Sequence, residues 1–527
     1  MINKKIKYIT FFILILLTLL PFSNAIIVNQ EVNNNEKTIL QQIQDAIIEN
    51  NAKWTAGETK ISSYSQNQLK VLFGGKLDKP SENYIEYSPP LYIDLPEEFD
   101  WRNVDGYNWL TPVKDQGVCG ACTAFAYTSA LESIIQITSN NIFNVDLSES
   151  HLFFCGGGSC DFGMYPWDAL DYLQNYGISD EACFPYEDKD MSCNSKSPDW
   201  EDRVIKVNSS GFVSDGDIKE ALITYGPLFT SFLVYQDFVH YQEGIYQPLW
   251  GANIGTHCVA IVGYNDTGEY WICKNSWGPE WGENGYFRIK YKKCDLDKDA
   301  RYLTLYESLP PTTPSVPDGP NSGQAGTPYY FTTQAEDPDD HGIYYLFDWG
   351  DSPDYELVHP HKSGAIVNVS HVWSVKDQGL FRIRVKAIDV YGYDSEWTAL
   401  TTINIYNNPP EAPAKPEGPS KIKPREENTY STYLNDSNGD QMYYIWDWGD
   451  NSEQDWMGPN KSKEIISSTH SWSYRGKYTI RVKAKDIHGA ESDWSEPKTI
   501  WGSKTKSYTI LNNFESILDR LLRFLNI

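Results

Sequence analysis

Two cysteines in one short stretch offer the first sign of chemistry in this sequence. Residues 116–122 read Gln-Gly-Val-Cys-Gly-Ala-Cys, so Cys119 and Cys122 form a C-x-x-C pair. Such a pair could supply a nucleophilic thiol, a redox-active dithiol or half of a zinc site. Taken alone, the motif gives these three interpretations about equal weight, and other residues must separate them.

A helix is the element that would position Cys122. Apolar side chains follow this cysteine at intervals typical of a helix, at Phe125, Ala130, Leu131, Ile134 and Ile135. The spacing predicts an amphipathic helix with Cys122 at or near its N-terminus. Free backbone N–H groups and the helix dipole stabilise an anion there. A thiol so placed can have its pKa lowered from about 8.5 to roughly 3.5–7.5, which favours the nucleophilic thiolate.

Two later stretches add a base and a partner for it. Residues 255–264 and 271–278 are apolar, β-type runs that carry His257 and Asn275. The turn-prone residues Asn-Asp-Thr-Gly lie between the two runs and predict a β-hairpin. The hairpin would bring His257 and Asn275 side by side at one end. This combination favours the nucleophile over the other two interpretations of the cysteine pair.

These three stretches resemble the catalytic motifs of papain-family cysteine peptidases. His257 and Asn275 follow Cys122 at about the 130–150 residues typical of that family. The resemblance implies an α+β, papain-like fold of two lobes, one helical and one a β-barrel. It also implies five roles: nucleophile for Cys122, acid and base for His257, orienting amide for Asn275, oxyanion-hole donor for Gln116, and shield of the His–Asn bond for Trp277.

The resemblance extends to a segment that helps to form the main specificity pocket, Tyr-Pro-Trp at 165–167. It implies that substrate contacts Gly163, Met164 and Tyr165, together with Trp277. The family usually has Gly-Gly before the tyrosine, whereas this chain has Gly163 and Met164. The sequence lacks an inserted loop with paired histidines of the kind that blocks the cleft of cathepsin B. We therefore expect an open cleft and endopeptidase action.

Two alternatives stay open on the sequence. Thr123 follows the predicted nucleophile, where the family usually has Trp or Tyr. This departure, with the one at Met164, keeps open a cell-surface adhesion or binding protein with a degenerate peptidase domain. The other alternative is a thiol–disulfide oxidoreductase that uses Cys119 and Cys122, and it requires both thiols to be free together.

The N-terminus has the pattern of a secretory signal peptide. Lysines at positions 4, 5 and 7 precede an apolar run from Ile9 to Leu20, and small residues at 23–25 fit cleavage after Ala25. The run is short for a membrane span, which needs about 20 apolar residues, so cleavage is favoured over an uncleaved anchor. We therefore expect a secreted or cell-surface protein, in which disulfides can form.

All of the cysteines, 9 in number, fall within the predicted peptidase region. The family resemblance implies two disulfides, Cys119–Cys160 and Cys155–Cys193. Apart from the predicted nucleophile Cys122, four cysteines have no pairing that the resemblance assigns: Cys183, Cys258, Cys273 and Cys294. The two of these that lie on the predicted hairpin strands, Cys258 and Cys273, could be small core residues.

Composition and repeats divide the chain into six parts. Pro-rich stretches at 310–314 and 407–410 mark two junctions. Residues 26–94 resemble the short propeptide of cathepsin B-like members, which implies a zymogen; a permanent N-terminal subdomain is the alternative. The predicted parts are a signal peptide (1–25), a propeptide (26–94), a peptidase domain (95–309), two β-sandwich domains (310–407 and 408–502) and an amphipathic tail (503–527).

An internal repeat of about 100 residues covers the two predicted β-sandwich domains. Asp-Trp-Gly-Asp at 348–351 recurs at 447–450, and His-x-Trp at 371–373 recurs at 470–472. Short alternating strands with turn signals predict Ig-like sandwiches. The motifs resemble PKD (polycystic kidney disease) domains of secreted microbial proteins. That resemblance implies spacer, adhesion or docking roles at a cell surface or an extracellular polymer.

Charge limits the partners of the protein. The chain has 44 Lys and Arg against 71 Asp and Glu, a formal net charge of −27, which argues against nucleic acid as a partner. We expect protein or peptide substrates and no metal or cofactor for the peptidase chemistry. Acidic runs at 337–340 and 436–440 could bind Ca²⁺ through oxygen ligands or form solvated turns. The tail would pack on the preceding domain, dock a partner or lie on a membrane surface.

Overall fold

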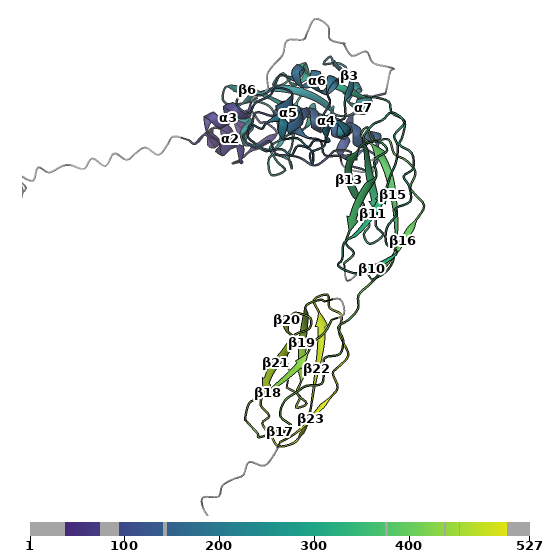
Figure 1. The fold of residues 1–527 in the computed structure, drawn as a ribbon. Coiled ribbons are helices and arrows are strands. Elements are labelled where there is room, and N and C mark those ends of the chain that lie inside the picture. The colour runs from purple at the N-terminus through teal and green to yellow at the C-terminus, as the bar shows by residue number, and fades with distance from the viewer. Residues whose placement is uncertain are drawn as a thin grey trace, which may run out of the picture.

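The structure is a computed structural model that describes residues 37–73, 94–140, 145–374, 378–436, 439–452 and 454–502. Figure 1 shows three bodies in chain order, a mixed body of helices and strands followed by two β-bodies. The predicted signal peptide and C-terminal tail lie outside the described residues. Within the described ranges, no helix combines the length and apolar character needed to cross a membrane.

Three helices build one lobe of the mixed body: α4 (Cys122–Thr138), α5 (Glu149–Cys155) and α6 (Pro166–Asn175). The helix predicted after Cys122 is confirmed, but it is central rather than amphipathic. Its polar residues Thr128, Glu132 and Gln136 are buried along with its apolar ones. The reason is that other parts of the protein, including Lys114 and the first β-body, cover the face that would otherwise meet solvent.

A nine-stranded sheet builds the other lobe. Its strands are β1 (Trp54–Ala56), β2 (Glu98–Asp100), β3 (Val207–Phe212), β4 (Leu228–Tyr235), β5 (Tyr241–Tyr246), β6 (Asn253–Asn265), β7 (Tyr270–Lys274), β8 (Tyr286–Lys290) and β9 (Arg301–Leu305). A further helix, α7 (Ile218–Tyr225), precedes β4. Strands β6 and β7 pair antiparallel, with Ala260 opposite Lys274, which confirms the predicted hairpin.

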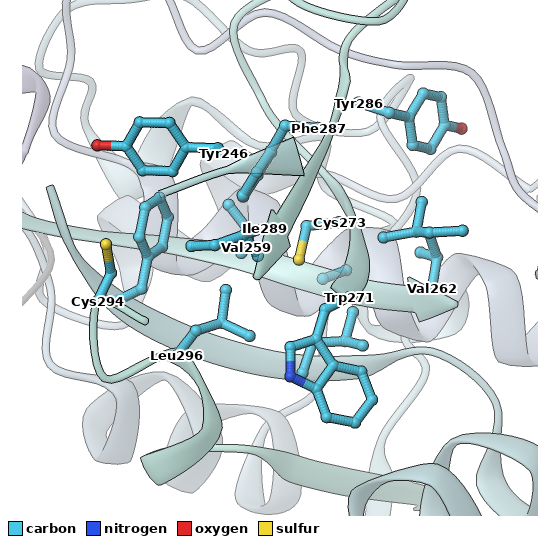
Figure 2. Close-up of a cluster of buried hydrophobic side chains, with 14 of the residues drawn as sticks. Tyr246, Val259, Val262, Trp271, Cys273, Tyr286, Phe287, Ile289, Cys294 and Leu296 are labelled. Carbon is cyan, nitrogen blue, oxygen red and sulfur yellow. The ribbon is translucent and has the colours of Figure 1, made fainter. Parts of the chain in front are cut away.

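The interior of this sheet is filled by apolar and aromatic side chains. Figure 2 shows part of the cluster, in which Val259, Trp271, Cys273 and Phe287 come from three neighbouring strands. Burial of so many large side chains fixes the register of the strands, because a shift by one residue would turn each apolar face outward. The helical lobe and the sheet together form the predicted α+β fold.

The described part of the predicted propeptide packs along one edge of this sheet. It contains α2 (Ile39–Glu49), β1, the short 3₁₀ helix η1 (Ile61–Ser63) and α3 (Gln66–Leu72). Both α-helices begin with a capping box, formed by Thr38 with Gln41 and by Ser65 with Gln68. Strand β1 pairs antiparallel with β5, and Trp54 lies edge-on against Tyr246 with 5.1 Å between ring centroids. The segment thus becomes an edge strand of the peptidase sheet.

The two β-bodies share one strand order, which confirms that the repeat is structural. The first contains a sheet in the order β10 (Ser322–Gln324), β16 (Thr401–Tyr406), β15 (Gly379–Asp389), β12 (Ile343–Asp348) and β13 (Glu356–His361), and a pair β11 (Tyr329–Thr333) and β14 (Val367–His371). The second contains β17 (Lys421–Ile422), β23 (Lys498–Gly502), β22 (Lys477–Asp486), β19 (Met442–Asp447) and β20 (Met457–Asn460), and a pair β18 (Asn428–Tyr433) and β21 (Ile465–His470).

The repeated sequence motifs meet in the core of each β-body. In the first, Asp351 is hydrogen-bonded to His371 at 2.7 Å, and the ring of Trp349 stacks on that histidine at 4.6 Å. In the second, Asp450 and His470 form the same bond at 2.8 Å. The Asp-Trp-Gly-Asp and His-x-Trp motifs therefore serve a structural purpose, since they join two segments through a partly buried hydrogen-bonded pair.

The first β-body packs directly on the helical lobe. Tyr344, Ile388 and Tyr391 share one buried core with Ile135 of α4. Gly342 lies so close to the mixed body that an added Cβ would be 2.2 Å from the carbonyl oxygen of Asp202. The core of the second β-body, in contrast, contains only residues of that body among those described. The domain boundaries predicted at 309 and 407 stay predictions.

His151 is a helix residue, as predicted, and it is fully buried in α5. The backbone N–H of Ser179 donates to its Nδ1 at 3.0 Å, so the neutral ring carries its proton on Nε2. Burial lowers the pKa of His151 to about 4. Protonation would place a second N–H against the Ser179 N–H, in a site that has little water to solvate the charge.

We expect this histidine to make the helical lobe sensitive to acid. Its folded-state pKa lies below the ordinary value near 6.5, so its contribution to stability is present above pH 6.5 and is lost as pH falls toward 4, by up to about 3 kcal/mol. His151→Asn keeps an acceptor for Ser179 and removes the titration. Hydrogen exchange of α5 amides should therefore accelerate less on acidification in the variant. Equal acceleration in both proteins would contradict this account.

Candidate active site

Cys122 is the first residue of α4, the position that the sequence predicts for a nucleophile. The residue before it, Ala121, has no side chain that could cap the helix. The backbone N–H groups of the first turn therefore remain available to an anion. Cys122 is fully buried in the structure.

The surroundings of Cys122 favour its thiolate. A hydrogen bond from the Cys258 thiol, followed by the hydrogen bond and charge of His257, holds the pKa of Cys122 well below its ordinary value. Burial acts in the opposite direction, because it penalises the charged form. The effects of Cys258 and His257, both on β6, outweigh burial and give the pKa of Cys122 its downward direction.

His257 and Asn275 lie at the same end of the β6–β7 hairpin. His257 Nε2 is 2.8 Å from Asn275 Oδ1, and the backbone N–H of Ser276 donates to the same oxygen at 2.8 Å. Because an amide oxygen only accepts, Nε2 carries the proton of this bond, and Nδ1 is buried without a hydrogen-bond partner among the described residues. Trp277 lies 4.8 Å from the His257 ring and is buried, so it keeps water from the bond.

Three hydrogen bonds hold Gln116 in place just before α4 begins. Its Nε2 donates to the Cys119 carbonyl at 2.9 Å, and its Oε1 accepts from the Ser276 hydroxyl at 2.6 Å. Its backbone N–H donates to the Ser276 carbonyl at 2.9 Å. The amide nitrogen has a second N–H that these bonds do not use. A fixed donor of this kind can stabilise a negative oxygen that develops nearby.

Two disulfides brace the helical lobe, Cys119–Cys160 and Cys155–Cys193. They are the pairs that the family resemblance implies. Cys119 is thus not free to form a dithiol with Cys122, which removes the premise of the oxidoreductase alternative in this structure. The backbone N–H of Gly120 also donates to the Cys160 carbonyl at 3.0 Å, so the loop before Cys122 is tied to the lobe twice.

A buried polar cluster fastens the hairpin to the helical lobe. Lys274, next to Asn275, donates to the Thr111 hydroxyl at 3.0 Å, and that hydroxyl donates to Glu132 of α4 at 2.7 Å. Lys114 donates to the same glutamate at 2.8 Å. Burial lowers the pKa of Lys274 to about 8. The cluster fixes the distance between the end of β7 and the body of α4.

Comparisons with known proteins agree with this geometry. A family model described as papain family cysteine protease matches residues 95–304, and one described as PKD domain matches residues 416–497. The cathepsin B-like protein CP2 of Giardia intestinalis is 34% identical over 223 residues, which cover 39% of this chain and 73% of that relative. This chain belongs to the papain family of cysteine proteases.

Further relatives extend the match to precursors. Pro-cathepsin H of Mus musculus is 35% identical over 235 residues, which cover 42% of this chain and 67% of that relative. A solved structure of procathepsin B S9 from Trypanosoma congolense is 25% identical, covers 51% of this chain and 98% of that chain, and has a TM-score of 0.46. The family match and the curated relatives, rather than the solved structure, show a cysteine-type peptidase that is made as a proform and acts on proteins or peptides.

The residues predicted to contact substrate differ in how exposed their side chains are. Tyr165 lies at the start of α6 and is exposed, whereas the side chain of Met164 is buried in the core of the helical lobe. Gly163 adopts a left-handed φ of 70°, which suits glycine. Met164 can therefore meet a substrate only through its backbone, while Trp277 covers the histidine. Their substrate contacts stay a prediction.

Two residues near the site were missed by the sequence analysis. Cys258 was interpreted as a small core residue, and it is buried, but its thiol also lies 3.5 Å from the hydroxyl of Thr123, the residue after Cys122, and helps to lower the pKa of Cys122. Phe73, just after α3, lies 6.3 Å from the His257 ring and 6.0 Å from Trp277. The hairpin places Cys258 directly beside His257, which was an available signal. Nothing local in the sequence indicated where Phe73 would lie.

Phe73 covers the catalytic end of the hairpin in the proform. It is buried, and an added Cβ at Gly255 would lie 2.6 Å from the Cβ of Phe73. The N-terminal segment therefore reaches the site through two anchors, Trp54 at the sheet edge and Phe73 on the histidine. A substrate cannot occupy the space above His257 while Phe73 remains there.

We expect Phe73→Ala to expose the nucleophile in the uncleaved chain. Loss of this contact lowers the free energy needed to open the segment. A decrease of about 1.4 kcal/mol in that free energy is enough to make labelling of Cys122 tenfold faster. The measurement is the rate at which a neutral alkylating reagent labels Cys122, read by mass spectrometry. Ile48→Ala is the control, because that side chain on α2 is 76% exposed. Equal labelling rates in the two variants would contradict a covering role for Phe73.

Proposed function

We propose that this papain-family protease is a secreted endopeptidase in which Cys122, His257 and Asn275 act as nucleophile, acid–base and orienting amide. The observation that carries the proposal is the 2.8 Å bond from His257 to Asn275, beside a cysteine at a helix N-terminus. The three groups come from two lobes, Cys122 from the start of α4 and the bonded pair His257 and Asn275 from the hairpin.

The proposed reaction has two halves. The Cys122 thiolate attacks the carbonyl carbon of the substrate, and the negative oxygen that forms is stabilised by Gln116 and the Cys122 backbone N–H. His257, as imidazolium, protonates the leaving amine, so the peptide bond breaks and a thioester remains. Neutral His257 then takes a proton from water, the hydroxide attacks the thioester, and the acid product leaves as the thiolate is restored.

Two observations support endopeptidase action. What covers the site in the proform is the N-terminal segment, through Phe73. The sequence has no loop with paired histidines that would close one end of the cleft. Removal of the segment would therefore leave a cleft that accepts an extended chain on both sides. The predicted signal peptide, together with two disulfides, supports secretion or display at the cell surface.

A substitution at Cys122 tests the proposed function. In enzyme freed of residues 26–94, Cys122→Ala should abolish peptide hydrolysis and labelling by a thiol-directed peptidyl electrophile, because no other cysteine among the described residues lies at a helix N-terminus beside His257. Cys183→Ala, at a buried cysteine outside the proposed site, serves as the matched control and should keep both. Retained hydrolysis in Cys122→Ala would refute the assignment. Absence of labelling in the wild type would favour an adhesion protein with a degenerate peptidase domain.

We propose that the two β-bodies attach the peptidase to an extracellular polymer or a cell surface.

We also propose that the first β-body binds Ca²⁺. Oxygens of Asp337 and Asp339 lie within 4.8 Å of each other and of a His341 nitrogen. Asp337 Oδ2 and Asp389 Oδ2 are buried without a hydrogen-bond partner among the described residues. Burial and the nearby charge of Asp337 raise the pKa of Asp389 to about 6. Hard carboxylate oxygens of this kind suit Ca²⁺, which would relieve their repulsion.

Calcium should slow the opening of the first β-body. We expect hydrogen exchange of the segment around Asp389 to be slower in millimolar CaCl₂ than in chelator at pH 7, where this carboxylate is charged. Asp337→Asn removes a charge and a ligand of the Asp337–Asp339–His341 group, so exchange should become independent of calcium. Asp354→Asn alters an exposed carboxylate of the same body and should retain the response. An unchanged exchange rate in wild-type protein would show that the carboxylates form only a buried turn.

A further inference from the structure

One face of the first β-body holds the helical lobe of the peptidase. Outward-pointing side chains of β12, β13 and β15, and of the loop after β15, pack on that lobe instead of on the core of their own body. An added Cβ at Gly392 would lie 2.9 Å from the carbonyl oxygen of Ile135, so this face and α4 are in direct contact. Among the residues of the face are Tyr344, Leu346, Leu357, Val390 and Trp397.

The second β-body has an equivalent face, on the sheet in which β19, β22 and β23 lie side by side (Figure 1). In the first body Asp348 lies opposite Arg384, and in the second Asp447 lies opposite Arg481. Both are ion pairs, at 2.9 and 2.5 Å. The shared register places these residues of the second body where the first has those that meet the peptidase, in the same order: Tyr443, Ile445, Trp456, Ile487 and Trp494.

These residues are more exposed than their counterparts. Ile487 is 47% exposed, whereas Val390 is 3% exposed. Tyr443 and Ile445 are partly buried, and the residues at their positions in the first body are buried. Apolar side chains that meet solvent on one body are therefore covered on the other, and the cover there is a protein surface that includes a helix.

An additional tryptophan extends the exposed face of the second body. Trp501 of β23 is 56% exposed, and Lys477 of β22 lies opposite it with its Nζ 5.7 Å from the ring centroid. The first β-body has the polar Asn404 at that position. Large apolar side chains gathered on one exposed face indicate a binding surface. We name this surface the outer face and define it by Tyr443, Ile445, Trp456, Ile487, Trp494 and Trp501.

The chain that follows β23 offers an occupant for the outer face. Strand β23 ends at Gly502, directly after Trp501, so residues 503–527 start at one end of the face. In this tail apolar residues recur at helical spacing, at 514, 517, 518, 521, 522 and 525. Residues 503–513 can span about 36 Å when extended, and β22, with 10 residues, rises about 33 Å. The apolar part of the tail can therefore reach every point of the face.

We propose that residues 514–525 form an amphipathic helix that docks on the outer face, as α4 packs on the equivalent face of the first β-body. Docking removes the apolar side chains of both partners from water. The charges are complementary as well. Helical spacing puts Glu515 and Asp519 on one flank of the predicted helix, and the outer face carries Lys485, whose Nζ lies 4.2 Å from the Trp456 ring centroid. The proposal is independent of the catalytic roles proposed above.

Hydrogen exchange of the tail amides tests this docking in the full chain. Cys122→Ala serves as the background, to prevent self-cleavage, and mass spectrometry follows residues 514–525 at pH 7. Exchange should be at least tenfold slower than in a free peptide of the same sequence, because an isolated helix of about 12 residues is marginal in water. Leu518→Asp, on the predicted apolar side, should remove this protection. Ser516→Asp, on the predicted polar side, should keep it.

Variants of the outer face show where the tail binds. Ile487→Asp places a charge on the face, and Trp494→Ala removes a large apolar side chain, so each should speed tail exchange toward the free-peptide rate. Ile465→Asp is the matched control, because that isoleucine is 74% exposed on β21, in the other sheet of the same body. Unchanged exchange of β22 amides in a variant shows that the body is still folded.

Four outcomes would overturn the proposal. The tail could exchange at the free-peptide rate in the parent chain, or its protection could survive both Ile487→Asp and Trp494→Ala. Protection that disappears on tenfold dilution would show that the tail docks on a second copy of the chain. Protection that appears only with vesicles of phosphatidylcholine and phosphatidylglycerol would show that it binds a membrane surface instead.

Discussion

The contact on which the site depends is the one between the N-terminus of α4 and the end of the β6–β7 hairpin. Neither element makes a site alone. The helix supplies a buried sulfur with free N–H groups around it, and the hairpin supplies an imidazole already bonded to Asn275 at 2.8 Å. The Lys274–Thr111–Glu132 cluster joins the end of β7 to the middle of α4 by two short hydrogen bonds. A misplacement of either lobe would separate the reacting groups, and these bonds oppose it.

Local patterns in the sequence were enough to predict the helix and the hairpin but not what surrounds the proposed reacting groups. Apolar spacing after Cys122 and the turn between two β-type runs predicted the helix and the hairpin, because both signals lie within a few residues. The contacts of Cys258 and Phe73 with the site join segments far apart in the chain, so no local pattern reports them. The same reason explains why α4 was predicted to be amphipathic although packing from several directions buries it on nearly every side.

The repeats illustrate a different limit. Their shared motifs identified two copies of one fold, and the structure explains the motifs through the Asp–His pairs and stacked tryptophans of each core. The copies nevertheless differ in how they meet the peptidase. Positions such as Gly342 and Tyr391 matter only because the first copy lies against the helical lobe. A comparison of the two copies by sequence cannot reveal that difference, since it depends on a third body.

Because α4 and the first β-body share one buried core, the peptidase domain does not end as a separate folding unit after β9. A shortened protein that stopped at the Pro-rich junction near residue 310 would leave Ile135 and its neighbours facing water, with an apolar patch where Tyr344, Ile388 and Tyr391 now lie. Such patches promote self-association. Recombinant work on the catalytic unit should therefore extend through residue 406, the end of β16, and treat the three parts up to that point as one folding and purification target.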